Sequence, residues 1–157
     1  MSYDVQFETL EAKHYIGVRR SVGVTEIAEA LGEMLPATFG LIESHAIVPA
    51  GPPVTIYFAY REAEGEFDML GGFFTHGMVD APEGFESGLI PGGDIAFVVH
   101  EGPYEQLGNA HEAVVLALDE RGRKAGSPCW DTYLNDPAEV SLEAIRTRVT
   151  YLLEREA

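Results

Sequence analysis

The strongest constraint on the fold is an order of predicted segments that occurs twice along the chain. Period-2 alternation of apolar and polar residues predicts strands, and apolar residues at helical spacing predict helices. The first half gives strands at 3–8 and 14–19, a helix from Thr25, then strands at 54–60 and 67–78. The second half gives strands at 85–90 and 94–100, a helix from 102–103 to about 121–122, then strands at 129–134 and 145–153. This order predicts an α+β fold of antiparallel strands with helices on them.

The repeated order suggests one domain over residues 1–157, built from pseudo-repeats at about 1–80 and 81–157. The alternative is an α+β domain whose halves match by chance. The last strand carries the clearest alternation, and the residues that face one way are Ile145, Thr147, Val149, Tyr151 and Leu153. Within the first helix, Thr25 is the expected N-cap and Pro36 the expected break, kink or new start. Gly71 and Gly72 predict a bulge in their strand.

Charge excludes some classes of function. The chain has a net charge of −16, and residues 21–120 hold 17 acids and a single base, Arg61. Direct nucleic-acid binding and anionic membrane surfaces need clustered Lys and Arg, so both are disfavoured. A cationic or neutral small molecule is compatible with this charge, although an acidic surface also serves solubility alone.

Motifs for catalysis, cofactors and metals are missing from the sequence. His111-Glu112 begins a zincin-like pattern, but position 115 is Val, and the other histidines have no metal-like spacing. We therefore expect no metal, no cofactor and histidines that lie at the surface or in the core. Cys129 stands alone, which excludes an internal disulfide. No signal peptide or membrane span is visible, so the expected compartment is the cytoplasm.

An acidic residue stands inside an aromatic strand at residues 128–137, Pro-Cys-Trp-Asp-Thr-Tyr-Leu-Asn-Asp-Pro. Asp is depleted in strands, so Asp131 needs a reason to be there. Alternation places Cys129, Asp131 and Tyr133 on one face, and Trp130 on the other. Either Asp131 points to solvent or caps a turn, or its poorly hydrated carboxylate lies in an aromatic cavity that attracts a cation.

Three segments together resemble the GyrI-like small-molecule-binding family, which also occurs as the effector-binding domain of AraC- and MerR-type multidrug regulators. They are the aromatic strand 54–58, the turn–strand–helix block 89–107, and the stretch 128–137. With the first strands included, the resemblance covers nearly the whole chain. It implies a duplicated β-α-β-β fold with a ligand cleft between the halves.

The resemblance also implies the site residues. The acid in the family's signature strand is the central residue for binding cationic, often aromatic compounds, and its position here is Asp131. The family usually has Glu at this place, so the shorter Asp reaches less far. The matching aromatic residues are Tyr57, Trp130 and Tyr133, with Phe97 as a further lining candidate. For each aromatic residue, core packing is the alternative.

Three hypotheses of function follow. The first is a stand-alone protein that senses or sequesters hydrophobic, cationic or aromatic small molecules, without a DNA-binding helix-turn-helix of its own. The second is a hydrolase that detoxifies a reactive small molecule in the same cleft, with Asp131 as general acid or base and Tyr133 or Tyr57 as proton donor. The third is a ligand-free interaction module. A homodimer through strand edges or a protein partner is compatible with each.

Overall fold

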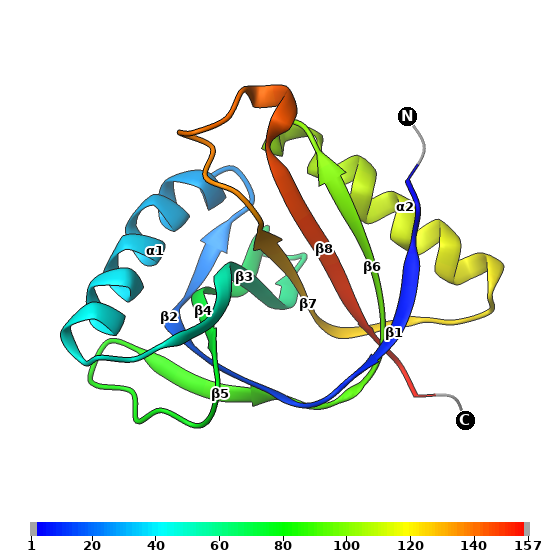
Figure 1. Cartoon of the computed structure of the whole chain (residues 1–157). Helices are drawn as coiled ribbons and strands as arrows, with labels where there is room; N and C mark the ends of the chain where they lie inside the picture. The colour runs from blue at the N-terminus through cyan, green and yellow to red at the C-terminus, as the bar shows by residue number, and fades with distance from the viewer. Residues whose placement is uncertain (1–2, 156–157) are drawn as a thin grey trace. The chain divides into compact units, whose positions relative to one another are not determined.

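The computed structural model describes residues 3–155, and these form eight strands, two α-helices and two short 3-10 turns (Figure 1). The strands are β1 Gln6–Leu10, β2 Lys13–Gly23, β3 Pro49–Arg61, β4 Glu66–Thr75, β5 Glu86–Ile90, β6 Gly93–Glu101, β7 Ala125–Tyr133 and β8 Arg146–Leu153. The helices are α1 Ile27–Ser44 and α2 Leu107–Glu120, and the 3-10 turns are Tyr104–Gln106 and Leu142–Ala144. Paired strands run antiparallel, which confirms the predicted α+β class.

The chain divides into two compact units. These units do not coincide with the two halves of the sequence, because each unit includes one strand from the other half. One unit contains the residues up to Glu11 and those from Gly92 onward, and the other spans Ala12–Pro91. Strand β1 therefore pairs with β6 of the second half, and β5 pairs with β2 of the first half. The halves repeat in sequence order, but each compact unit is completed by a strand from the other half.

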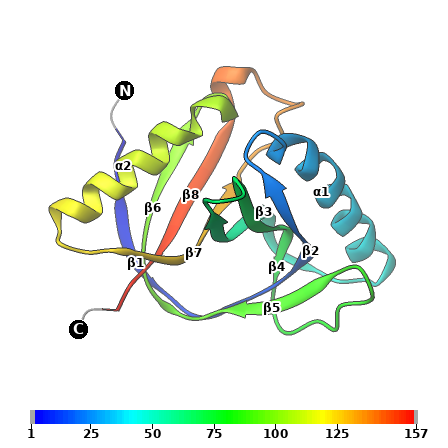
Figure 2. The same ribbon diagram turned by 180° about the vertical axis from the view of Figure 1, so that it is seen from behind.

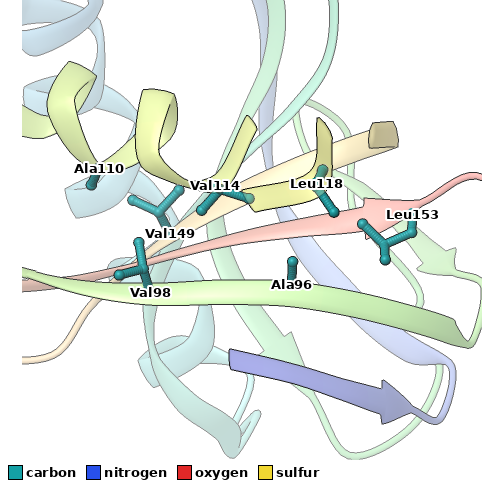
Figure 3. Packing of buried hydrophobic residues seen from close by; sticks show 7 residues of the cluster. All are labelled: Ala96, Val98, Ala110, Val114, Leu118, Val149 and Leu153. Carbon is teal, nitrogen blue, oxygen red and sulfur yellow. The ribbon is translucent and has the colours of Figure 1, made fainter. Parts of the chain in front are cut away.

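The unit that contains α2 has the strand order β1-β6-β8-β7. Helix α2 packs on β6 and β8, as both ribbon views show (Figures 1 and 2). Its buried side chains Ala110, Val114 and Leu118 point at the sheet (Figure 3). They meet side chains of β6 and β8, namely Ala96, Val98, Val149 and Leu153. This core identifies which face of the sheet the helix covers.

The unit that contains α1 has the strand order β3-β4-β2-β5. Helix α1 runs through Pro36 without a break, although the sequence predicts a break, a kink or a new start there. Its buried residues Ala30, Met34, Thr38, Leu41 and Ile42 stay in helical phase on both sides of the proline. Packing along this continuous face offsets the hydrogen bond that the proline removes. The expected cap is also wrong, because the N-cap is Glu26 and not Thr25.

Gly71 and Gly72 do not form the predicted bulge. They pair in regular register with Val18 and Gly17 of β2. The register shifts of β3 against β4 lie elsewhere, at 49–53 and 57–59. A Cβ on Gly72 would collide with the backbone carbonyl of Ile16. These glycines therefore permit close approach of two backbones.

We expect Gly72→Ala to lower the free energy of unfolding by about 3 kcal/mol, because backbone atoms on both sides must shift. Gly40→Ala is the matched control, since Gly40 lies in α1 and a Cβ there meets nothing within 4 Å. That change should stabilise the protein by about 1 kcal/mol. Urea unfolding of both variants measures the difference, and equal midpoints would contradict the close approach.

Candidate ligand-binding site

Asp131 lies on the face of β7 that α2 covers. Its Cα pairs with Val149 of β8, which pairs in turn with Val98 of β6. Both valines belong to the core beneath α2, and side chains in such a row point to the same side of the sheet. Asp131 is only 2% exposed. The strand alternation expected from the sequence therefore carries a carboxylate into the space under the helix.

His111 on α2 is the nearest basic side chain to this carboxylate. Its Nε2 lies 3.2 Å from Oδ1 of Asp131. The angles do not make this an aligned hydrogen bond, and no residue between 3 and 155 gives Oδ1 one. The Nδ1 atom of His111 lies 2.7 Å from the hydroxyl of Tyr151. A contact chain thus runs from Tyr151 through His111 to Asp131.

The groups around Asp131 keep their protons. Burial, reinforced by the Asp131 carboxylate, raises the pKa of the Cys129 thiol to about 12. Burial, followed by the charges of Cys129 and Asp131, also raises the pKa of Tyr151. A protonated phenol can donate to Nδ1 of His111, and in that arrangement Nε2 of the imidazole carries a proton and faces Asp131. Cys129 is therefore no nucleophile at neutral pH.

A second buried oxygen without a partner lies on the same face. Thr147 of β8 is 0% exposed, and its Oγ1 has no hydrogen bond to any residue in the described range 3–155. Thr147 pairs with Tyr133, next to the pair of Asp131 with Val149. On its other side it pairs with His100, whose ring nitrogens are occupied by the Tyr3 hydroxyl and the Pro103 carbonyl. The patch under α2 thus combines one buried carboxylate oxygen and one buried hydroxyl.

Of the other residues expected at the site, Tyr133 lies on the same face of the sheet as Asp131, while Trp130 and Phe97 lie on the opposite face. Tyr133 shares the face of Asp131 and packs edge-on against Tyr104, with ring centroids 5.8 Å apart. Trp130 and Phe97 both lie on the opposite face, since each pairs with Thr150 of β8. There the guanidinium of Arg148 stands 5.4 Å from the Phe97 ring centroid.

Tyr57 belongs to the compact unit that contains α1. It packs against Met69 and the neighbouring core under α1, and its ring meets Phe67 edge-on at 5.2 Å. Within its own unit, Tyr57 is therefore a partly buried aromatic residue beside a helix-covered core.

The sequence pattern alone does not identify His111, Tyr151 and Thr147 as neighbours of Asp131. A usable signal was present for each. His111 is spaced three residues before Val114 and seven before Leu118, so it falls on the apolar face of α2. Tyr151 and Thr147 belong to the set of β8 residues expected to face one way. A polar group on a buried face needs a partner, and the buried partner of His111 is the strand acid.

A surface pocket of about 460 Å³ lies elsewhere on this unit. Its lining includes Phe7, Thr9, Asp94, Arg121 and Arg123, and none of the residues expected at the site. Asp94, Arg121 and Arg123 there are already engaged. Arg123 and Thr9 both donate to Asp94, and Arg121 stacks on Phe7 at 3.9 Å from the ring centroid. We therefore assign the candidate site to the patch around Asp131, where buried oxygens lack partners.

A family model for the GyrI-like small molecule binding domain matches residues 3–152. The chain belongs to this family. The resemblance expected from the three sequence segments is thus confirmed over nearly the whole chain, and with it the assignment as a small-molecule-binding domain.

Solved structures of other proteins show a similar fold. The EcmrR chain from an EcmrR–DNA complex superimposes with a TM-score of 0.82 at 14% identity, over 98% of this chain and 58% of that one. This chain thus spans little more than half of the EcmrR chain. SAV2435 bound to tetraphenylphosphonium gives 0.70 at 11% identity, over 98% and 94% of the two chains. A hydrolase from Listeria innocua gives 0.57 at 10% identity, over 96% and 92%. At these identities the likeness shows the fold.

No curated protein matches the sequence. Among residues 3–155, no helix is both long and apolar enough to cross a membrane. Within the same range, no three His, Cys, Asp or Glu side chains gather closely enough to hold a metal ion.

The raised pKa of Cys129 predicts slow alkylation of the folded protein. At pH 8 a thiol with a pKa of about 12 is thiolate in only about one molecule in 10⁴, against about one in ten at the ordinary value of 9.0. Iodoacetamide should therefore modify the folded chain about a thousandfold more slowly than the urea-unfolded chain. Cys129 is the single cysteine, so mass spectrometry reads the rate directly. Equal rates would contradict the burial of this thiol beside Asp131.

Proposed function

We propose that this domain binds hydrophobic, cationic or aromatic small molecules at Asp131, and that it senses or sequesters them. The observation that carries the proposal is the Asp131 carboxylate. It is 2% exposed, and its Oδ1 lacks an aligned hydrogen bond from any of residues 3–155. A buried anion without full compensation gains more from an incoming cation than a hydrated surface anion does.

The surroundings of Asp131 support a ligand that is both cationic and aromatic. Tyr133 and Tyr104 form an edge-on aromatic pair on the same face, and Tyr151 stands beside His111. Aromatic faces attract cations and provide apolar area at once. The net charge of −16 adds a field that draws cations toward the molecule. Trp130 and Phe97 face the other side of this sheet, so the proposal rests on Asp131 and Tyr133 among the residues expected from the sequence.

The proposal also covers the compartment of the domain and its partners. We place the domain in the cytoplasm and expect no direct contact with nucleic acid, because the chain lacks a basic cluster that could pair with phosphates. The domain would then act by sequestering its ligand, or by signalling ligand binding to a second copy of the chain or to a protein partner.

The test is a thermal-shift comparison of tetraphenylphosphonium with neutral triphenylphosphine oxide. A ligand at about 100 times its Kd should stabilise the fold by about 2.7 kcal/mol. We expect the cation to stabilise the wild type more than the neutral probe does. Asp131→Asn should lose most of the shift caused by the cation and keep the shift caused by the neutral compound.

Asp119→Asn is the matched control for overall charge. Asp119 lies on the exposed side of α2, so this change also removes one negative charge but leaves the buried patch intact. It should bind both probes as the wild type does. If both variants lose cation binding equally, the general field attracts the ligand and the proposal for Asp131 fails.

A hydrolase is the second candidate, and the contact chain from Tyr151 through His111 to Asp131 favours it. A histidine whose Nε2–H faces a carboxylate can serve as a general base through Nδ1 once water replaces the Tyr151 hydroxyl at that atom. Such an enzyme would convert a reactive electrophile such as styrene oxide to its diol. His111→Gln should then abolish diol formation, measured by chromatography, while cation binding persists. Turnover that is unchanged in this variant would exclude the mechanism.

A further inference from the structure

Two oxygen atoms on the face beneath α2 offer hydrogen-bond acceptors that the protein leaves unused. One is Oδ1 of Asp131 and the other is Oγ1 of Thr147, and neither has a hydrogen-bond partner among residues 3–155. Both residues are almost fully buried, at 2% and 0% exposed. Most buried polar atoms in proteins have a partner, so two exceptions on one face require an explanation.

The two residues are close enough to serve one ligand. Asp131 pairs with Val149, and Tyr133 pairs with Thr147, so Asp131 and Thr147 are diagonal neighbours across β7 and β8. Diagonal neighbours on one face of an antiparallel pair lie about 7–8 Å apart at their Cα atoms. A single small polar group between them can approach both oxygens.

The protein's own nearby donors are already committed or badly aimed. His100, next to Thr147, is engaged by Tyr3 and by the Pro103 carbonyl. His111 reaches 3.2 Å from Oδ1 of Asp131 but without the alignment of a hydrogen bond. The side chain of His111 is 25% exposed while that of Asp131 is 3% exposed, so this contact joins a partly exposed imidazole to a buried carboxylate.

We infer that the preferred ligand of this site is a protonated amine that carries N–H donors, rather than a quaternary ammonium or phosphonium ion. The inference rests on the proposed function and specifies its ligand. A permanently charged ion shields its charge with carbon and donates no hydrogen bond. An ammonium group donates to the carboxylate of Asp131 and to the hydroxyl oxygen of Thr147 while it supplies the same charge.

The number of hydrogen bonds to a charged group sets how much more tightly an amine binds than a quaternary ion. Each such bond typically corresponds to a factor of about ten or more in affinity. The amine should therefore bind at least about tenfold more tightly than its trimethylated form. A tertiary amine keeps a single N–H, so it should fall between the two.

The experiment uses one hydrophobic skeleton with four polar ends, namely 2,2-diphenylethylamine, its N,N-dimethyl and N,N,N-trimethylammonium derivatives, and neutral 2,2-diphenylethanol. At pH 7 the amines are protonated, since aliphatic amines titrate near pH 10. Isothermal titration with the wild-type chain gives four affinities. We expect the primary amine to bind most tightly, followed by the tertiary amine, the quaternary ion and the alcohol.

Thr147→Val separates the hydrogen bond from the charge. Valine has nearly the same shape, and losing an unpartnered buried hydroxyl should not lower the melting temperature. The variant should bind the amine more weakly and the quaternary ion unchanged. Thr150→Val is the control, because Thr150 is buried in the same strand but faces away from α2. It should leave the ratio of the two affinities as in the wild type.

The outcomes distinguish this inference from the proposed function. If the quaternary ion binds as tightly as the amine, and both lose affinity in Asp131→Asn, the proposed function stands and the inference is overturned. If all four compounds bind equally, the charge argument at Asp131 fails and both are overturned. Failure of all four to bind also overturns both for this class of ligand. An amine preference that Thr147→Val leaves unchanged overturns the role of Thr147.

Discussion

The candidate site depends on the free-energy cost of burying the Asp131 carboxylate away from water. Asp131 stands in a row with Val149 and Val98, under a helix whose buried face is otherwise aliphatic. A carboxylate in such a place costs several kcal/mol unless other groups compensate it. The core beneath α2 offsets this cost by burying apolar area, while His111 compensates the charge only in part. Oδ1 of Asp131 is therefore left without an aligned hydrogen bond from residues 3–155.

A second acidic cluster, in the unit that contains α1, shows what full compensation looks like. Arg19 donates to both carboxylate oxygens of Asp68 at 2.9 and 2.7 Å and to Glu86 at 2.7 Å. Its guanidinium also stacks 4.1 Å from the ring centroid of Phe58. These hydrogen bonds hold the pKa of Asp68 below its usual value. Carboxylates and an aromatic ring already hold a cation here, so this cluster has no need of a ligand.

Most of the fold follows from local patterns, and the site follows only in part. Period-2 alternation in β7 places Asp131 and Trp130 on opposite faces, because strand geometry is local. Two features depended on distant residues. The exchange of β1 and β5 between the compact units leaves no trace in either strand. The approach of His111 depends on how α2 rotates over the sheet, and its place on the apolar face of the helix gives a direction but no partner.

The short side chain at position 131 fits the presence of His111. The resemblance to the family implies Glu at this place, and Glu would carry the carboxylate about 1.5 Å further from the strand, toward α2. His111 Nε2 already lies 3.2 Å from Oδ1 of Asp131, so a longer acid and this imidazole could not keep their present positions together. Asp leaves room for a histidine that is itself anchored by Tyr151 at 2.7 Å. The shorter acid thus keeps its carboxylate beside a histidine that helix α2 supplies.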